Sequence, residues 1–548
     1  MAVQIPYPAL VPVAGGAVVA DGSGARRVGR DEARRIFRSG DVLLAHAVFV
    51  SGRLRTPPAR AVFDVLELFA FVRPAHPFIP SPLGLARALH LELPHDAEGY
   101  ARALIDAAQT LLEELAGLPG ETKAKLAPLA ASLGKAGWRW GAPCVAALGE
   151  PEPSNNPIRG FEAWRALREW EDSAAPDKPS AHPVSDSEAI ARLRDLVGDT
   201  HESRPEQSEY AQAATYAFGP RETEGAPKIA LIEAGTGTGK TLGYLAPASV
   251  WAEKNGPGLW LSTYTRNLQR QIMQEIARLY PDPAERNDKA VVRKGRENYL
   301  CLLNFEEAVK RNALAPGQRA VALGLTARWV GATSDGDVSG AGFPAFLAAS
   351  MPLREITDRR GECIYSACMH YRTCFIEKAI RKARHAPIVV ANHALVIAQS
   401  SQDWLASDQT TDAPPERRTR YVFDEGHHLF DAADSGFAAL ISGQEMAELR
   451  RWIRGPERGA RSRMKGLQER VKDLIDDDDN AKDALSEAVA ASGALAAEGW
   501  LGRVAQGGAH GPGETFLAAA YQHVLARNDD RDAFYNIEAG VEAPGEDL

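Results

Sequence analysis

The residues best suited to hold a phosphate chain lie in IALIEAGTGTGKTLGYLAPA, near the middle of the 548-residue sequence. An apolar run, a glycine-rich loop and a second apolar run follow one another, which predicts a strand, a loop and a helix. Glycines let backbone N–H groups turn toward phosphate oxygens, and the N-terminus of the following helix attracts the same charge. Lys240 would reach the β- and γ-phosphates of a nucleotide, and the Thr241 hydroxyl would bind Mg²⁺. The residues expected to contact the nucleotide here are Ala234, Gly235, Thr236, Gly237, Thr238, Gly239, Lys240 and Thr241.

An acidic pair that could serve this loop follows the apolar run RYVF, in RYVFDEGHHLFD. Asp424 would hold Mg²⁺, directly or through water, and Glu425 would orient and deprotonate the water that attacks the γ-phosphate. An exposed turn between a strand and a helix can carry two acids without any such role. Because this acidic pair accompanies a phosphate-binding loop, the two motifs together predict ATP hydrolysis.

The five cysteines are distributed unevenly, because Cys363, Cys368 and Cys374 all lie within CIYSACMHYRTC. Cys301 ends KGRENYLC, and Cys144 lies alone in an apolar stretch, where we expect a buried side chain. The N-terminus lacks the charged start of a secretory signal, so we expect a reducing, cytoplasmic environment that disfavours disulfides. Four thiolates suit either a tetrahedral zinc ion or a four-cysteine iron–sulfur cluster. The spacings of four and five residues favour the larger cluster and leave zinc open as the alternative.

The elements that must position these residues belong to a chain of several domains. A length of 548 residues corresponds to three or four domains at roughly 150 residues each. The composition, 45% hydrophobic and 25% charged, is that of ordinary globular protein. A formal charge of −9 gives no general affinity for nucleic acid, so any such partner needs a local basic surface. No run of about 18 apolar residues occurs, so we expect no membrane span.

Four zones follow one another along the chain, and none repeats another. Residues 1–120 alternate apolar runs with helical stretches, an α/β pattern, and 121–195 form a Pro-, Ser-, Asn- and Asp-containing linker that carries a helix. Between 196 and 430, short apolar strands recur between helices, which is typical of a parallel sheet covered on both faces. Residues 431–548 are helical and highly charged.

These motifs, in this order, resemble those of the DinG/XPD-like iron–sulfur DNA helicases of superfamily 2. The loop has the A-x-x-G-x-G-K-T form of helicases, and DEGH, which ends in His427, is a variant of the DEAH box. RPEQSEYAQ resembles the segment in which a glutamine, here Gln207, contacts adenine. LSTYTRNLQRQI resembles motif Ia, whose residues track the DNA backbone and would be Thr263, Thr265, Asn267 and Gln269. One cysteine after KGRENYL and three more before VVANHAL also follow the order of the family.

The resemblance implies an α/β fold built on a RecA-like P-loop motor domain over residues 196–430. This domain would carry an iron–sulfur insertion at about 295–385, and an Arch-like helical region would follow at 431–548. The cofactors would be ATP, Mg²⁺ and a [4Fe–4S] cluster. The residues implied for catalysis are Lys240, Thr241, Asp424, Glu425 and His427, and those implied for the cluster are Cys301, Cys363, Cys368 and Cys374.

The activity that the resemblance implies is ATP-dependent 5′→3′ translocation on single-stranded DNA, in DNA repair and replication. The partners would be single-stranded or forked DNA and a single-stranded-DNA-binding protein, and we expect a monomer. No second motor domain with its arginine finger follows residue 430, so we expect nucleotide binding by this chain but no unwinding. The alternatives are a nucleotide- and nucleic-acid-binding module without catalysis, and an exonuclease.

Local charge and aromatic residues near the cysteines suit a surface for single-stranded DNA. Between residues 351 and 385 there are eight Lys and Arg against four Asp and Glu, with three interleaved Tyr and Phe. Cations bind phosphates and rings stack with bases, so we expect Arg372, Arg381 and Lys382 to contact DNA. The affinity should then fall steeply with salt. A solvated helix face over buried aromatic residues would have the same composition.

The first zone resembles DnaQ-like 3′–5′ exonucleases, which implies an RNase H-like α/β domain over residues 1–120. Those nucleases use an Asp-x-Glu pair on the first strand for two-metal hydrolysis, and GGAVVADGSG offers no such pair. Ala47 stands where the family has Asn, and Ala101 stands where it has His. Only Asp64 and Asp106 remain of the acidic set, so we expect an exonuclease-like scaffold without nuclease activity.

Overall fold

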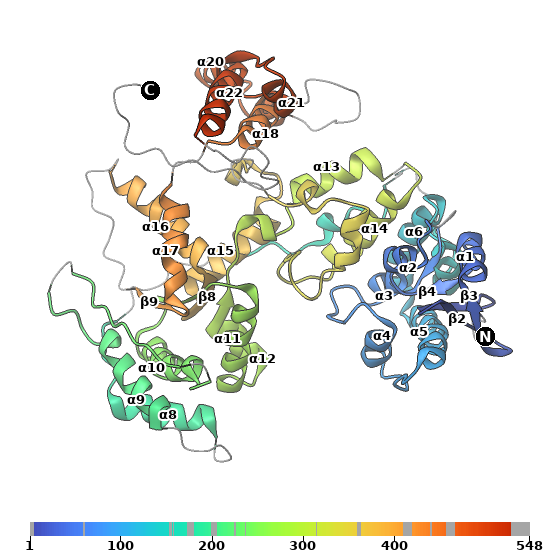
Figure 1. Ribbon diagram of the computed structural model, residues 1–548, viewed down its shortest axis with the longest axis horizontal. Coiled ribbons are helices and arrows are strands. Elements are labelled where there is room, and N and C mark those ends of the chain that lie inside the picture. Colours follow the sequence, from blue (N-terminus) through green and yellow to red (C-terminus); the bar gives the residue numbers. More distant parts are fainter. Residues whose placement is uncertain are drawn as a thin grey trace. The chain divides into compact units, whose positions relative to one another are not determined.

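The structure is a computed structural model, and it divides the chain into two compact units (Figure 1). Residues 1–360 and 368–437 form the first unit, and residues 361–367 and 438–548 form the second. No helix in the described part of the chain is long and apolar enough to cross a membrane. The structure describes residues 5–57, 61–152, 156, 158–171, 180–198, 205–223, 226–235, 237–313, 315–358, 363–408 (backbone only for 402–408), 419–438, 441–455 and 466–527.

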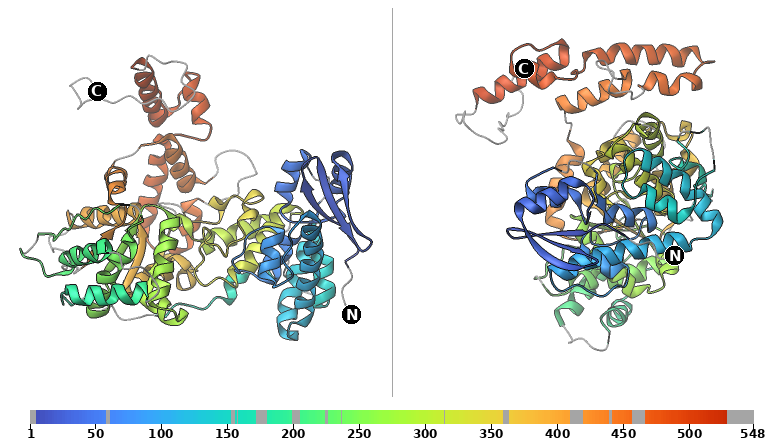
Figure 2. Two further views of the ribbon diagram at one scale, coloured as in Figure 1. Left: turned by 60° about the horizontal axis from the view of Figure 1, so that its bottom comes forward. Right: turned by 90° about the vertical axis from the view of Figure 1, so that its right-hand side faces the viewer.

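The N-terminal part of the first unit is built on a five-stranded sheet with the order β3-β2-β1-β4-β5 (Figures 1 and 2). The first three strands are antiparallel neighbours, whereas β4 runs parallel to β1 and β5 parallel to β4. The chain therefore turns back through two hairpins before it enters the parallel part of the sheet. The strand bounds are Ala9–Val13 (β1), Gly16–Asp21 (β2), Gly24–Gly29 (β3), Leu43–Leu44 (β4) and Phe63–Asp64 (β5).

Alternating residues of these strands enter two separate cores, as the period of a strand requires. Leu10 and Val19 pack with helices α1 and α2 on one face, whereas Ala9 and Val18 pack with α3 and α5 on the other. The sheet is thus covered on both sides. The helix bounds are Arg30–Ser39 (α1), Ala47–Leu54 (α2), Val65–Val72 (α3), Pro82–Ala88 (α4), Ala97–Gly117 (α5), Gly120–Lys135 (α6) and Gly141–Leu148 (α7).

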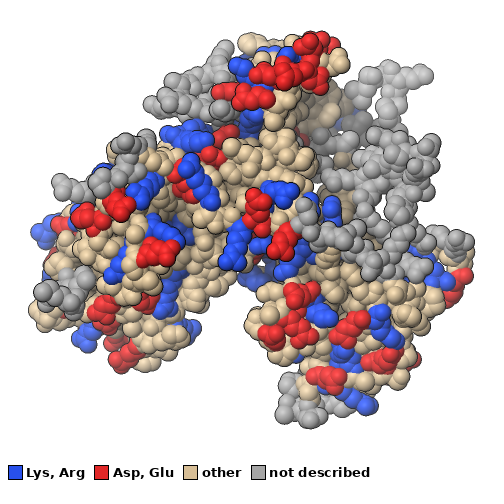
Figure 3. Space-filling model, turned by 180° about the vertical axis from the view of Figure 1, so that it is seen from behind, with Lys and Arg blue, Asp and Glu red and all other residues tan. Residues whose placement is uncertain are grey.

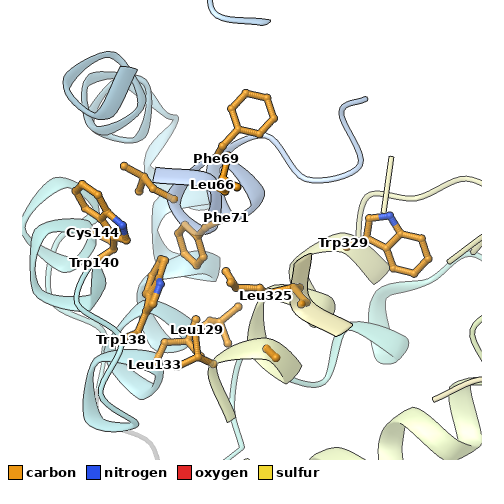
Figure 4. Packing of buried hydrophobic residues seen from close by; sticks show 14 of the residues in the cluster. Leu66, Phe69, Phe71, Leu129, Leu133, Trp138, Trp140, Cys144, Leu325 and Trp329 are labelled. Atoms are coloured by element: carbon orange, nitrogen blue, oxygen red, sulfur yellow. The ribbon is translucent and has the colours of Figure 1, made fainter. Parts of the chain in front are cut away.

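The N-terminal sheet domain shares its larger core with helices from the middle of the chain. Figure 4 shows Phe71, Leu129, Leu133 and Trp138 gathered against Leu325, which comes from α14. A Cβ added at Gly324 of α14 would lie 2.4 Å from the Leu133 Cδ2, so α6 and α14 are in close contact there. The Arg328 Nε also donates to the Phe71 carbonyl at 2.9 Å. The helices concerned are Leu302–Asn312 (α13) and Gln318–Val330 (α14).

The expected linker at 121–195 differs from the structure over its first part. Residues 120–135 and 141–148 form α6 and α7, whose apolar side chains belong to the shared core. The composition rich in Pro, Ser and Asn begins only after residue 149. Residues 121–148 carry enough apolar surface to pack, and they therefore fold with the sheet that precedes them.

Two acidic residues accept hydrogen bonds from tryptophans of the loop between α6 and α7, one through its side chain and one through its backbone carbonyl. The Trp138 Nε1 donates to the Glu67 Oε2 at 2.9 Å, and the Trp140 Nε1 donates to the Asp64 carbonyl at 2.8 Å. Burial raises the pKa of Glu67 from 4.5 to about 8, and repulsion from the Asp64 carboxylate adds to the rise. Between about pH 5 and pH 8, Glu67 is therefore protonated in the folded protein and ionised in the unfolded chain.

The raised pKa predicts that this region loses stability as the pH rises. The free energy of unfolding should fall between about pH 5 and pH 8, because the unfolded state binds fewer protons there. Glu67→Gln keeps an acceptor for Trp138 and removes the charge, so it should flatten this slope and stabilise the protein near pH 8. Urea denaturation followed by tryptophan fluorescence measures the slope. Glu121→Gln, at a residue whose side chain is 81% exposed, is the control that should keep it.

The second sheet of the first unit is wholly parallel and has the order β7-β8-β6-β9. Its strands are short and rich in Val, Ile and Leu, as strands covered by helices on both faces are. The strand bounds are Leu259–Thr263 (β6), Ala290–Val292 (β7), Ile388–Asn392 (β8) and Arg420–Phe423 (β9). The surrounding helices are Asp186–Val197 (α8), Pro205–Thr215 (α9), Lys240–Asn255 (α10), Arg266–Leu279 (α11), Pro283–Lys289 (α12), Phe375–His385 (α15), His393–Asp408 (α16) and Leu429–Phe437 (α17).

The strand expected before the glycine-rich loop is not formed, which corrects the sequence prediction. Residues 228–233 pair with no strand in the described part of the chain. Ile229 and Leu231 are 65% and 95% exposed, although their apolar character suggested a buried strand. A strand needs a neighbouring strand for its backbone hydrogen bonds. In the described sheet β9 is paired with β6 alone, and residues 228–233 do not pair with its other edge.

The second unit is helical, as expected for the region after residue 431, although α17 belongs to the first unit. Its centre is Glu514, whose side chain is fully buried. Glu514 accepts hydrogen bonds from the Arg503 guanidinium and from the backbone N–H groups of Ala497 and His510. Because these donors favour the charged carboxylate, they lower the pKa of Glu514 to about 2. The helices are Gly443–Arg454 (α18), Leu467–Val471 (α19), Asp479–Ala491 (α20), Trp500–Ala505 (α21) and Gly511–Ala526 (α22).

Candidate nucleotide site and cysteine module

The glycine-rich loop ends at α10, whose first residue is Lys240. Gly237 and Gly239 both have a φ of 81°, a left-handed conformation that favours glycine. A Cβ at Gly239 would also lie 2.1 Å from the Gln207 Nε2, so a larger residue there would displace the Gln207 side chain. The Thr238 hydroxyl donates to the Gly235 carbonyl at 2.9 Å and closes the loop on itself. Thr236 lies outside the described residues.

The acidic pair lies directly opposite the start of α10. Asp424 continues β9, because its N–H donates to the Ser262 carbonyl of β6 at 2.8 Å. Glu425 follows with a φ of 56°, and its Oε1 lies 3.4 Å from the Lys240 Nζ. The structure thus brings together Lys240 and Glu425, which are 185 residues apart in the chain. His427 is 66% exposed, and its Nδ1 lies 3.6 Å from the Glu425 Oε2.

The electrostatics of this pair favour a cation. Burial raises the pKa of Asp424, and repulsion from Glu425 adds to the rise, while Lys240 opposes it. Burial, together with the Asp424 charge, raises the pKa of the nearby Tyr244 hydroxyl. Two carboxylates beside one ammonium, with the Thr241 hydroxyl at the start of the same helix, are ligands that suit Mg²⁺.

Gln207 is placed differently from the adenine contact that the sequence suggested. Its side chain is buried, and its Nε2 donates to the Gly239 carbonyl at 2.9 Å. It therefore supports the glycine-rich loop from the side of α9. The adenine contact stays a prediction.

The residues expected to contact the DNA backbone are divided between the surface and the interior. Thr263 and Gln269 are buried, whereas Thr265 and Asn267 are exposed. The Thr265 hydroxyl accepts from the Leu268 N–H at 3.2 Å and so caps α11. The sequence analysis missed Tyr264, whose ring stacks on His428 with centroids 3.8 Å apart. In the sequence, an aromatic residue between two threonines was the only indication that Tyr264 could belong to the site.

Cys301, Cys368 and Cys374 belong to the first unit, and no disulfide joins any of the five cysteines, all of which lie in the described part of the chain. Cys301 precedes the first turn of α13, and Cys374 precedes that of α15. Burial raises the pKa of the Cys301 thiol, with smaller contributions from Asp358, Cys374 and Cys368. Cys363 belongs to residues 361–367 of the second unit, where its sulfur accepts from the Tyr365 N–H at 3.3 Å.

In the described part of the chain, no three His, Cys, Asp or Glu side chains are already arranged to hold a metal ion. The chemistry of the four thiols fits zinc or an iron–sulfur cluster, because thiolates are the preferred ligands of both. The four-cysteine ligand set and the identity of the metal therefore both stay predictions.

Comparison with known proteins places part of this chain among helicases. No family model matches it. It is 32% identical over 246 residues to the ATP-dependent DNA helicase YoaA of Escherichia coli, which covers 45% of this chain and 36% of that protein. It is 32% identical over 284 residues to the ATP-dependent helicase DinG of Mycobacterium tuberculosis H37Rv, which covers 47% of this chain and 39% of that protein. The 3′-5′ exonuclease DinG of Bacillus subtilis is 28% identical over 42% of this chain and 23% of its own length.

Nearly half of the chain is thus homologous to DinG and YoaA helicases. The chain spans well under half the length of these relatives. Its mixed α/β structure with a parallel sheet is consistent with the RecA-like domain of a DinG-like helicase.

The cysteine module, residues 295–358 and 368–385, is held by a hydrogen bond between His370 and Glu306 and by the preceding linker. The His370 Nε2 lies 2.6 Å from the Glu306 Oε2 of α13, and the Trp164 ring contacts His370 edge-on. The Trp170 Nε1 donates to the Tyr371 carbonyl at 2.8 Å. Residues 158–171 therefore pack against the loop that carries two of the cysteines, a role that their linker-like composition did not indicate.

The basic residues predicted to contact DNA lie near this packing. The Arg381 guanidinium lies 3.6 Å from the centre of the Trp170 ring, and the Arg372 guanidinium lies 5.8 Å from it. Lys382 is exposed. On the face seen in Figure 3, Lys and Arg are interspersed with Asp and Glu, so a DNA surface would be local rather than broad. These three contacts stay predictions.

Proposed function

We propose that this chain carries the ATP-binding motor part of a DinG-like DNA helicase and binds single-stranded DNA. The observation that carries the proposal is the meeting of Lys240 and Glu425 at 3.4 Å, which unites the two predicted motifs at one site. The homology to ATP-dependent DNA helicases supports ATP as the nucleotide and DNA as the substrate. The translocation polarity and the biological role rest on the relatives alone.

The Lys240–Glu425 pair indicates how nucleotide binding would act on the site. A bound triphosphate would attract the Lys240 ammonium away from Glu425, because phosphate oxygens carry more charge than one carboxylate. Glu425 would then be free to accept a proton from a water molecule aligned with the γ-phosphate. Asp424 and the Thr241 hydroxyl would hold Mg²⁺, which neutralises phosphate charge during the reaction.

The four cysteines Cys301, Cys363, Cys368 and Cys374 would hold a [4Fe–4S] cluster in the same protein. Their spacing supports iron–sulfur over zinc, and so does the resemblance of their order along the chain to that of the DinG/XPD-like family. The cluster would brace the loop against α13 and α15, and it would supply a redox-active group beside the DNA path. Equal affinity for DNA in the oxidised and reduced forms would leave bracing as its role.

We do not propose nuclease activity, although one relative is named an exonuclease. The order of the N-terminal sheet supports an RNase H-like scaffold. The Asp64 carboxylate, however, accepts from the N–H groups of His46, Ala47 and Leu66, so it serves the backbone rather than a metal. Asp106 is exposed on α5, and no Asp-x-Glu pair lies on β1.

Salt dependence of DNA binding tests the proposed function. The affinity for a single-stranded oligonucleotide should fall linearly with salt on logarithmic axes, with a slope of roughly −0.7 for each phosphate contacted. The double substitution Arg372→Gln and Arg381→Gln should reduce the slope by more than one unit, roughly as two lost contacts require. Lys125→Gln, on an exposed turn of α6, is the matched control and should leave the slope unchanged. A flat salt response of the unsubstituted protein would contradict the proposal.

A further inference from the structure

A chain of hydrogen bonds crosses three neighbouring strands beside the candidate catalytic carboxylates. His393 is the first residue of α16, immediately after β8, and its side chain is 1% exposed. Its Nδ1 lies 2.8 Å from the Ser262 hydroxyl of β6, and its Nε2 lies 3.0 Å from the Asp424 carbonyl at the end of β9. Since β6 lies between β8 and β9, His393 connects the end of β8 with the end of β9 across β6.

The chemistry of the acceptor determines the direction of this chain. A carbonyl oxygen only accepts, so the Nε2 of His393 must carry the hydrogen that it shares with Asp424. In the neutral ring the Nδ1 is then the acceptor, and the Ser262 hydroxyl donates to it. Ser262 is fully buried, so neither partner can exchange these bonds for water. The bonds therefore hold His393 in one tautomer and one orientation.

The carbonyl that His393 binds belongs to the peptide bond between Asp424 and Glu425. Glu425 has a φ of 56°, a left-handed conformation that strains a non-glycine residue and persists only where its surroundings impose it. The hydrogen bond from His393 fixes the plane of that peptide bond. It thereby fixes the direction in which the Glu425 side chain leaves the backbone, toward Lys240.

The same turn is held from a second side. Residues 426–428 form a single turn of 3₁₀-helix, and the His428 ring at its end stacks on Tyr264, with the two ring planes inclined by 13°. Tyr264 follows β6 directly, so both contacts tie the turn to the carboxyl edge of the sheet. Of the two, only the His393 bond acts on the peptide bond that joins the carboxylates.

We propose that His393 is a positioning residue for the Asp424–Glu425 pair, and that its Nε2–H orients the two carboxylates for Mg²⁺–nucleotide. Ser262 sets the tautomer that makes this donation possible. His393 contacts neither nucleotide nor metal in this scheme and acts only through the backbone of Asp424. The inference rests on the proposed function, since it assigns a support to the same site.

Two substitutions separate the hydrogen bond from the volume of the ring. The amide nitrogen of His393→Gln can reach the position of the Nε2 and donate to Asp424, whereas that of His393→Asn is too short. The measurement is the affinity for a fluorescent ATP analogue, taken with Mg²⁺ and again with a chelator. We expect the gain in affinity caused by Mg²⁺ to be about tenfold smaller in His393→Asn than in the unsubstituted protein, which is the effect of one buried hydrogen bond. His393→Gln should keep most of this gain.

The affinity without Mg²⁺ distinguishes positioning from a structural role. It should be unchanged in both variants, because the glycine-rich loop and Lys240 do not contact His393. Thr326→Ala, which removes a buried hydroxyl that bonds the Ala322 carbonyl within α14, is the matched control and should alter neither affinity. Equal losses with and without Mg²⁺, or equal Mg²⁺ gains in the Gln and Asn variants, would overturn the inference. Absence of nucleotide binding by the unsubstituted protein would instead overturn the proposed function, and the inference with it.

Discussion

Cys301→Ser is expected to remove the metal centre from the protein. The anaerobically purified chain should contain about four irons and four acid-labile sulfides, and the variant should contain almost none. Cys301 is partly buried and precedes α13, which packs into the core shared with the N-terminal sheet. A serine hydroxyl is a poor ligand for iron compared with a thiolate, so the remaining three thiols would not retain a four-iron cluster.

The matched control for this experiment is Cys144→Ala. Cys144 is fully buried in α7, outside the predicted ligand set, and burial raises the pKa of its thiol. The control should therefore keep its iron and sulfide, with only the modest loss of stability of a small core change. One zinc without sulfide in the unsubstituted protein would replace the cluster by a structural zinc ion. Full iron content in Cys301→Ser would exclude Cys301 as a ligand.

The second large effect is expected for Lys240→Ala, which should weaken the binding of Mg²⁺–ATP by roughly 10- to 100-fold. This range corresponds to the loss of charged hydrogen bonds, about 1.5–3 kcal/mol. Lys240 is the first residue of α10. Among the described residues, it is the only Lys or Arg that forms an ion pair with Glu425. Isothermal titration calorimetry with a non-hydrolysable ATP analogue measures the affinity directly.

Lys254→Ala provides a control on the same helix. Lys254 lies in the last turn of α10, where its Nζ pairs with Glu188 at 2.7 Å and donates to the Pro183 carbonyl at 2.8 Å. Its removal takes away a lysine of similar exposure without touching the glycine-rich loop, so the affinity for nucleotide should not change. An unchanged affinity in Lys240→Ala as well would mean that the loop does not bind phosphate in the proposed way.

The parts of the candidate site that depend on neighbours in the chain could be predicted from the amino-acid sequence. Glycines at 237 and 239 and a helix beginning at Lys240 follow from local backbone preferences, so the loop could be predicted and is seen. The strand of residues 420–423 that ends before Asp424 was equally predictable from its apolar run. The two motifs could be recognised in the sequence, and their proximity could be expected. The 3.4 Å distance between the Lys240 Nζ and the Glu425 Oε1 comes from the structure.

Features of the site and the core that depend on residues far away in the chain could be seen only in the tertiary structure. Residues 228–233 have the composition of a strand, yet the structure pairs them with no strand of the described sheet, not even with the open edge of β9. Gln207, His393 and Tyr264 likewise take their roles from side chains or carbonyls that the sequence does not place beside them. The core that joins α6 to α14 has the same origin, because hydrophobic burial is non-directional and does not encode which apolar faces will meet.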